Sequence, residues 1–266
     1  MTTPAAADAD RASPITVGAI AVIAYAICDM IHEVLGHGTA TLFSPDVKAV
    51  SLTTVALSTL GSSRLVAAAG TLANLLASLA AFALWRRKRG SVAVRYFFWL
   101  LASLNLLNAT AYLLYSGILG IGDWSVVTAN LEPHLVWRVG MVVVGAATYS
   151  LSVYVSAVTL GRMVSDGCVR RSDVHQLSRV PYWVGGVLFV VGAVPNPVSR
   201  WLILSSGASS GFGAMAGLLW VPRIVRAPAS EPELRASSLG FSRGWTVAAI
   251  LVAAVFVLVI GRGIRL

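Results

Sequence analysis

The stretch Ile31-His32-Glu33-Val34-Leu35-Gly36-His37 lies inside an apolar run from Ile15 to Phe43. Ionisable side chains are costly at membrane depth, so within an apolar span they mark a functional site. Two imidazoles are nitrogen ligands that zinc accepts, and a neighbouring carboxylate can take a proton from a water activated by the metal. The stretch therefore predicts a buried metal site on a membrane helix. The alternative is a set of polar side chains satisfied by neighbouring helices.

The composition favours a membrane protein with several spans. The 266 residues are 57% hydrophobic and 12% charged, with a mean hydropathy of +0.78, whereas soluble domains carry about 25% charged residues. A helix needs about 20 residues to cross a bilayer. Apolar stretches of suitable length occur at residues 15–42, 64–85, 96–121, 135–160, 181–195, 201–221 and 244–261. We therefore expect an all-α, polytopic transmembrane bundle of six to seven spans, since the fifth stretch is short.

The chain divides into three parts on this reading. Residues 1–13, rich in Ala, Asp and Thr, predict a disordered cytoplasmic tail. Residues 14–125 predict a catalytic membrane core of three spans, because the candidate metal ligands fall there. Residues 126–266 predict additional transmembrane helices.

The net charge of +9 predicts topology rather than nucleic-acid binding. Cytoplasmic segments of membrane proteins carry an excess of Lys and Arg. With a cytoplasmic amino terminus, 14 of the 20 basic residues fall inside. The six outside are Lys48, Arg64, Arg138, Arg200, Arg262 and Arg265. We expect an integral, multi-pass protein of the cell membrane with no nucleic-acid partner, while the oligomeric state stays open.

The spacing of the two histidines demands a distorted helix. His32 and His37 are five residues apart, so on an ideal helix their directions would diverge by about 140°. A single wide π turn absorbs the extra residue, and Gly36 lowers the steric cost of forming one. Asp29 precedes His32 by three residues. It could orient a ligand imidazole from behind, or be a ligand itself.

A catalytic zinc site takes three protein ligands and leaves one position open. Asp123, just after the third apolar stretch, is the preferred third ligand, because it reaches the same membrane face as His37. The alternative for Asp123 is an interfacial carboxylate beside an anchoring Trp124. Glu132 and His134 are second choices in the outer loop, and His175 falls in a cytoplasmic loop.

These residues resemble the site-2 protease family of intramembrane zinc metalloproteases, with a variant His-Glu-x-x-x-His motif. The first element carries one residue more than the family's His-Glu-x-x-His. The dipeptidyl peptidase III family of zinc peptidases has the same longer spacing. Ala69-Gly70-Thr71-Leu72-Ala73-Asn74 resembles the family's second element. Leu104-Asn105-Leu106-Leu107-Asn108 with Gly122-Asp123 loosely resembles the third, without its proline. The resemblance implies a zinc ion held by His32, His37 and Asp123.

The expected activity is hydrolysis of a peptide bond in or near the membrane span of a substrate protein, within the lipid bilayer. Glu33 would act as general base. Asn74 would polarise the scissile carbonyl or hold the substrate backbone. Asn105 and Asn108 are alternatives for that role, or else interhelical hydrogen-bond partners. Two other functions stay open: a metal-dependent hydrolase of lipid amides or esters, and a cation transporter or metal-binding membrane protein without enzymatic activity.

A weaker pattern follows the second histidine. The run Lys48-Ala49-Val50-Ser51-Leu52-Thr53-Thr54-Val55-Ala56-Leu57 is partly alternating and β-branched, which favours an extended segment. An edge strand beside the metal could pair with an unwound substrate. The alternative is an interfacial loop.

Overall fold

The computed structural model describes residues 11–87, 90–226 and 239–266. Residues 1–10 of the expected disordered tail lie outside this part. Its last residues are held against the bundle: Ala12 N donates to Asp173 Oδ2 at 3.3 Å, and Ser13 N donates to Leu239 O at 2.7 Å.

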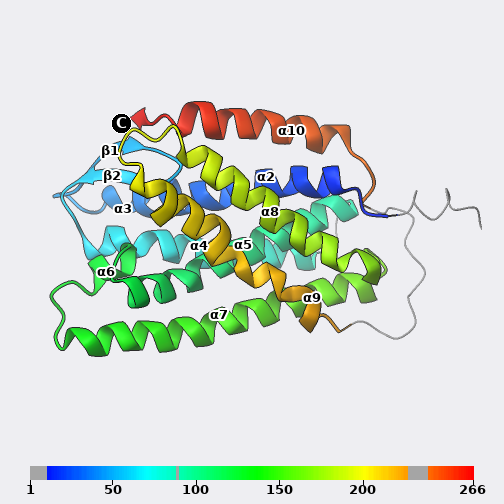
Figure 1. The fold of residues 1–266 in the computed structure, drawn as a ribbon, viewed down its shortest axis with the longest axis horizontal. Helices are drawn as coiled ribbons and strands as arrows, with labels where there is room; N and C mark the ends of the chain where they lie inside the picture. The colour runs from blue at the N-terminus through cyan, green and yellow to red at the C-terminus, as the bar shows by residue number, and fades with distance from the viewer. Residues whose placement is uncertain (1–10, 88–89, 227–238) are drawn as a thin grey trace, which may run out of the picture.

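The described residues form a bundle of helices (Figure 1). The structure is 74% helical. In chain order the helices are α2 (Pro14–Met30), η1 (Ile31–Gly38), α3 (Thr39–Thr41), α4 (Arg64–Arg86), α5 (Val92–Leu119), α6 (Asp123–Val127), α7 (His134–Ser165), η2 (Arg171–Asp173), α8 (Val174–Ala193), η3 (Ile203–Gly213), η4 (Ala214–Leu219), α9 (Val221–Ile224), α10 (Arg243–Ala254) and η5 (Val255–Ile260). In the bundle, α2, α4, α5, α7 and α10 run along the long axis, while α8 and the segment that ends at α9 cross them obliquely (Figure 1).

Serine residues start four of the helices. Ser13, Ser63, Ser91 and Ser242 each accept a hydrogen bond from a backbone N–H in the first turn of α2, α4, α5 and α10. Such N-caps satisfy donors that the helix itself leaves free. Pro14 at the start of α2 costs nothing, because its missing N–H would have had no partner in the helix.

Five helical segments among the described residues are long and apolar enough to cross a membrane. They are Pro14–Thr41, Arg64–Arg86, Val92–Leu119, His134–Ser165 and Arg243–Ile260. The protein is therefore of the multi-pass membrane type. The other two predicted stretches are also largely helical, but they are not among the five. Residues 181–193 of the first lie in α8, and the second, 201–221, covers η3, η4 and the first residue of α9.

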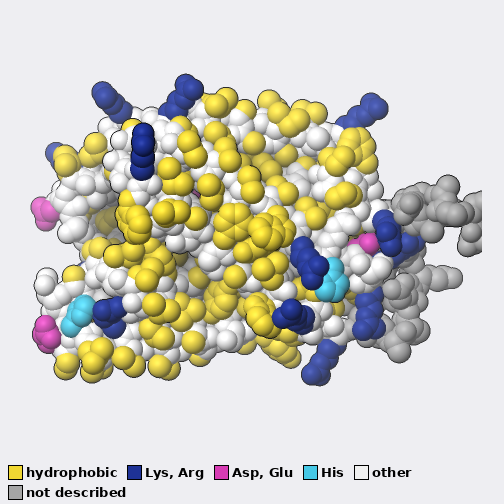
Figure 2. All heavy atoms as spheres, viewed as in Figure 1, with side chains coloured by type: hydrophobic (Ala, Val, Ile, Leu, Met, Phe, Trp, Pro, Cys, Tyr) yellow, Lys and Arg dark blue, Asp and Glu magenta, His cyan; other side chains and the backbone are white. Residues whose placement is uncertain are grey.

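Charged side chains gather toward the two ends of the bundle, and hydrophobic side chains cover the surface between them (Figure 2). Large apolar side chains on the long helices are exposed, among them Leu76 and Leu79 in α4 and Val143 in α7. Exposed apolar surface of this kind fits a lipid environment. Below we call the end that carries the β-strands the sheet end, and the opposite end, with Arg86, Arg95 and Arg162, the basic end.

A three-stranded antiparallel sheet is the departure from the expected all-α fold. Its strands are β1 (Lys48–Leu52), β2 (Leu57–Leu60) and β3 (Ile264–Arg265), in the order β2-β1-β3. The predicted extended segment is confirmed over β1. However, β1 is the middle strand and not an edge, since β3 from the carboxyl terminus pairs with it, Ser51 opposite Arg265. The local sequence around β1 could not predict this pairing, because it joins two segments that are far apart in the chain. The edge strand beside the histidines is β2.

The centre of the bundle is α5, which packs against α2, α4 and α7. Trp99, Leu100, Leu104 and Leu107 are fully buried on it. In a membrane, close packing of such side chains stabilises helix contacts through van der Waals interactions. This packing fixes α5 against the helices that carry the histidines and their partners.

Candidate metal centre

A π-helix carries the two histidines. It is η1, so the wide turn that the five-residue spacing predicted is confirmed. His32, Glu33 and His37 are all buried, and one ligand atom from each lies within 4.8 Å of the others. The centroids of the two imidazole rings are 4.7 Å apart, and the ring planes make an angle of 88°. The wide turn thus brings the three side chains into a group that could hold a metal ion.

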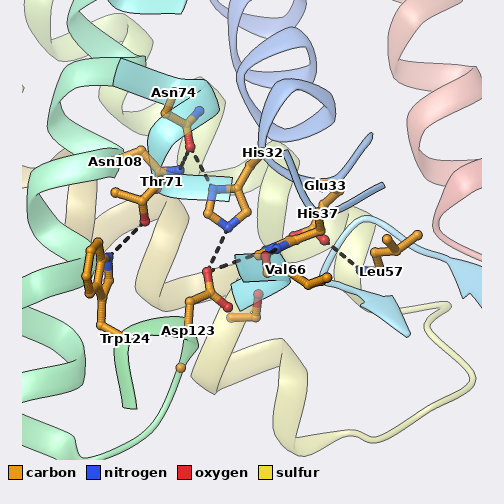
Figure 3. A network of polar contacts seen from close by, with 12 residues as sticks. His32, Glu33, His37, Leu57, Val66, Thr71, Asn74, Asn108, Asp123 and Trp124 are labelled. Carbon is orange, nitrogen blue, oxygen red and sulfur yellow. Dashed lines mark hydrogen bonds and ion pairs between the residues drawn. The ribbon is translucent and has the colours of Figure 1, made fainter. Parts of the chain in front are cut away.

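Two groups on α4 accept hydrogen bonds from the imidazoles and so fix the orientation of both rings (Figure 3). His32 Nδ1 lies 2.6 Å from Asn74 Oδ1, and His37 Nδ1 lies 2.6 Å from Val66 O. Both partners are acceptors, so each Nδ1 carries a proton, and a ring without a second proton offers the lone pair of Nε2 to a metal ion. Metal-binding histidines are oriented in this way in proteins.

The amide of Asn74 is itself fixed. Its Nδ2 donates to Cys28 O at 3.3 Å and to Asn105 Oδ1 at 2.7 Å, which leaves Oδ1 for His32. Asn108 Nδ2 donates to Asn74 Oδ1 at 3.3 Å. Asn74 and Asn105 are fully buried. The asparagines predicted to contact substrate are brought together here as an interhelical network behind His32.

Asp123 faces the two Nε2 atoms from the first turn of α6. Its Oδ2 lies 3.0 Å from His32 Nε2 and 3.5 Å from His37 Nε2. Burial by itself raises the pKa of Asp123, but hydrogen bonds from His32 and His37 outweigh it and hold that pKa well below the usual value. Without a cation, the short contact with Nε2 needs a second proton on the His32 ring. A cation at the shared point would satisfy both Nε2 atoms and the carboxylate together.

Gly36 and Gly70 leave space where the two Nε2 atoms and Asp123 converge. A Cβ on Gly70 would lie 2.6 Å from His32 Nε2 and 2.8 Å from His37 Nε2. A Cβ on Gly36 would lie 2.5 Å from the Cα of Gly70. Therefore η1 and α4 cross at a contact that leaves no room for side chains, and the gap beneath the imidazoles stays open.

Glu33 is held differently from Asp123. Leu57 N, at the start of β2, donates to Glu33 Oε2 at 2.6 Å. Glu33 lines a cleft of about 420 Å³ at the sheet end, together with His37 and Asp123. The cleft joins η1, β2, α6 and η3. The carboxylate of Glu33 is thus fixed beside the histidines and reaches open space.

The remaining predicted candidates lie elsewhere. Asp29 makes no hydrogen bond to either imidazole in the described part of the chain; its Oδ2 has no partner there. Asn74 takes the position at His32 that was expected for Asp29. Glu132 and His134 line a separate cavity beside Arg138. His175 is in the first turn of α8, at the basic end.

Sequence reasoning missed Tyr112 and Trp124 as parts of the site. The ring of Tyr112 stacks on His32, with centroids 4.7 Å apart. Tyr112 follows Asn108 by one helical turn, which places both on one face of α5. Trp124 Nε1 donates to Thr71 Oγ1 at 3.0 Å, which ties α6 to α4 next to Asp123.

No protein-family model matches the chain, and no curated protein or solved structure shows significant similarity to it. The functional argument therefore rests on the geometry of the site.

Proposed function

We propose that the protein is an intramembrane zinc metalloprotease that hydrolyses a peptide bond in or near the membrane span of another protein. One observation carries the proposal: the π-helix brings His32, Glu33 and His37 together at a point that Asp123 also reaches.

The donor set fits zinc. Zinc bonds to nitrogen and oxygen ligands are about 2.0–2.2 Å long, so tetrahedral ligands lie about 3.3 Å from one another. The separations of 3.0 and 3.5 Å between Asp123 Oδ2 and the Nε2 atoms agree with this. Two imidazoles and one carboxylate are three protein ligands, the number that leaves a position open. When bound, zinc supplies Lewis-acid activation of a water and of the scissile carbonyl.

Glu33 is the general base in this proposal. It takes the proton from the attacking water and passes it to the leaving nitrogen. Leu57 N fixes one carboxylate oxygen and leaves the other for this transfer. Asn74 acts as a positioning residue that holds the His32 ring. Asn105 and Asn108 support Asn74, so for all three asparagines we favour this role over substrate contact.

We infer a seven-span arrangement with the amino terminus in the cytoplasm. In this arrangement α8 and the η3–α9 segment cross together with the five longer helices. The basic end faces the cytoplasm of a cell membrane, as the positive-inside rule favours, and the cleft opens outward. Cysteine labelling tests this. In a background of Cys28→Ala and Cys168→Ser, Ser91→Cys should react only from the cytoplasm, and Ser199→Cys only from outside. The reverse pattern would contradict the orientation.

A metal-dependent lipid amide or ester hydrolase is the second candidate. An apolar cavity of about 420 Å³ lies beside the cleft and shares Tyr112, Tyr115 and Ser205 with it. A cavity of this character next to the metal ligands suits an acyl chain as well as an apolar peptide side chain.

Turnover on two substrate panels tests the proposal and separates the candidates. The purified protein is incubated with single-span membrane peptides and with lipids, with and without a chelator. We expect peptide cleavage that the chelator removes and added zinc restores. Glu33→Gln should lose about 10²–10⁴-fold in rate and keep its metal, whereas Glu132→Gln should behave as wild type. Cleavage confined to lipids would favour the second candidate, and unchanged turnover in Glu33→Gln would contradict both.

A further inference from the structure

A second polar cavity lies at the basic end, far along the bundle from the histidines. It has a volume of about 250 Å³ and forms where α4 ends, α5 begins and α7 ends. Its lining residues are Trp85, Arg86, Arg95, Arg162, Ser165 and Asp166. Three arginines thus meet one aspartate, which gives the cavity an excess of positive charge.

Arg95 is the buried member of this cluster. Only 7% of its side chain is exposed, and NH2 donates to Asp166 Oδ2 at 2.6 Å. NH1 donates to Cys168 Sγ at 2.9 Å, and the guanidinium lies 5.1 Å from the ring centroid of Trp85. These contacts hold the guanidinium in place, whereas Arg86 and Arg162 are exposed at the rim.

Two buried N–H groups in this lining, Arg95 Nε and Trp85 Nε1, have no hydrogen-bond acceptor among the described residues. Arginine and the indole N–H can only donate, and buried donors without an acceptor are rare in folded proteins. What the cavity lacks is therefore an acceptor, and the positive excess favours an anionic one.

We propose that this cavity binds a phosphate-type oxyanion. Arg95 and Trp85 supply donors from the buried side, and Arg86 and Arg162 supply charge at the rim. The cavity has room for about eight waters at roughly 30 Å³ each, which is enough for a phosphate group. Its position at the ends of three long helices allows two sources of the same chemistry: the phosphate of an anionic lipid headgroup at the membrane surface, or a soluble phosphate.

Binding to the full-length protein tests this. The protein is purified in neutral detergent without phosphate and titrated with inorganic phosphate, with short-chain phosphatidic acid, and with phosphatidylcholine of the same chain length. Native mass spectrometry and thermal unfolding report binding. The test variant is Arg86→Gln/Arg162→Gln. Its control is Arg87→Gln/Arg223→Gln, which removes two exposed arginines outside the cavity lining. Trp85→Phe removes one donor and keeps the ring.

We expect phosphatidic acid to bind the wild type more tightly than phosphatidylcholine. The test variant should weaken that binding at least tenfold, as loss of charge-assisted hydrogen bonds does. The control should stay within about twofold, and Trp85→Phe should fall between them. Binding of inorganic phosphate as well would identify a soluble oxyanion as the source, and phosphatidic acid alone would identify a lipid headgroup. Absence of binding by both ligands, or equal weakening in the test variant and the control, would overturn the proposal.

Discussion

The two ends of the bundle differ in the buried polar groups that they present, acceptors at the sheet end and N–H donors at the basic end. At the sheet end, Asn74 and Val66 satisfy the Nδ1 atoms of the histidines, and the Nε2 lone pairs converge with Asp123 on one point. A cation at that point would satisfy both Nε2 atoms and the carboxylate. At the basic end, the buried N–H groups of Arg95 Nε and Trp85 Nε1 have no acceptor among the described residues, and an anion in the cavity would supply one. The converging Nε2 atoms and carboxylate at one end therefore suit a cation, and the buried N–H donors at the other end suit an anion, although both ends are rich in charge.

The largest effect should follow from filling the space under the imidazoles. Gly70→Ala places a methyl group 2.6 Å from His32 Nε2. We expect the protein to fold and to lose both metal and turnover, because the methyl occupies the point where the ligands converge. Metal content and thermal stability measure this. Gly140→Ala is the control, because a Cβ there meets nothing within 4 Å. Full metal content in Gly70→Ala would show that a metal ion does not bind at the point beside Gly70 where the ligands converge.

Asp123 should rank next. Asp123→Ala removes the carboxylate that contacts both Nε2 atoms. Even partners one shell further out change metal affinity about 10–100-fold, so we expect a loss of at least about 100-fold here. Asp123→Asn should lose nearly as much, since a neutral amide is a poorer zinc ligand. Competition with a chelator measures the affinity. Asp46→Ala, an exposed acid before β1, should have no effect. Wild-type affinity in Asp123→Ala would make Asp123 an interfacial carboxylate.

Asn74 tests the network behind His32. Asn74→Leu keeps the approximate volume and removes the acceptor for His32 Nδ1. Metal affinity should fall about 10–100-fold. Asn105→Leu, one hydrogen bond further from the ring, should lose less. A slower rate with unchanged metal affinity in Asn74→Leu would instead favour the substrate-binding role that the sequence suggested.

The smallest effect should come from Thr71. Thr71→Val removes the acceptor for Trp124 Nε1 and so loosens α6 beside Asp123. We expect a loss of metal affinity below about tenfold, because a neutral hydrogen bond contributes only about 0.5–1.5 kcal/mol. Chelator competition again provides the measurement. A loss as large as that of Asp123→Ala would mean that Thr71 does more than anchor α6.

Much of the candidate metal site could be predicted from local sequence. The apolar run around His32 and His37 predicted the membrane helix, and the five-residue spacing predicted the π turn now seen in η1. Asp123 was predicted from its membrane depth, and the structure brings it to both histidines.

Other parts could not be predicted, because they depend on contacts between distant segments. The acceptor at His37 is a backbone carbonyl, which every residue has, so no side chain in the sequence marked Val66. The pairing of β3 with β1 joins the carboxyl terminus to the first half of the chain. The hydrogen bond from Leu57 to Glu33 depends on where β2 lies once the sheet has formed.

The metal content of the purified protein tests the central claim most directly. We expect about one zinc per chain after preparation without chelator, the same amount in Glu33→Gln, and none in the double variant His32→Ala/His37→Ala. Absence of metal from the wild type, with no uptake when zinc is added, would contradict the proposed centre and the enzymatic function built on it.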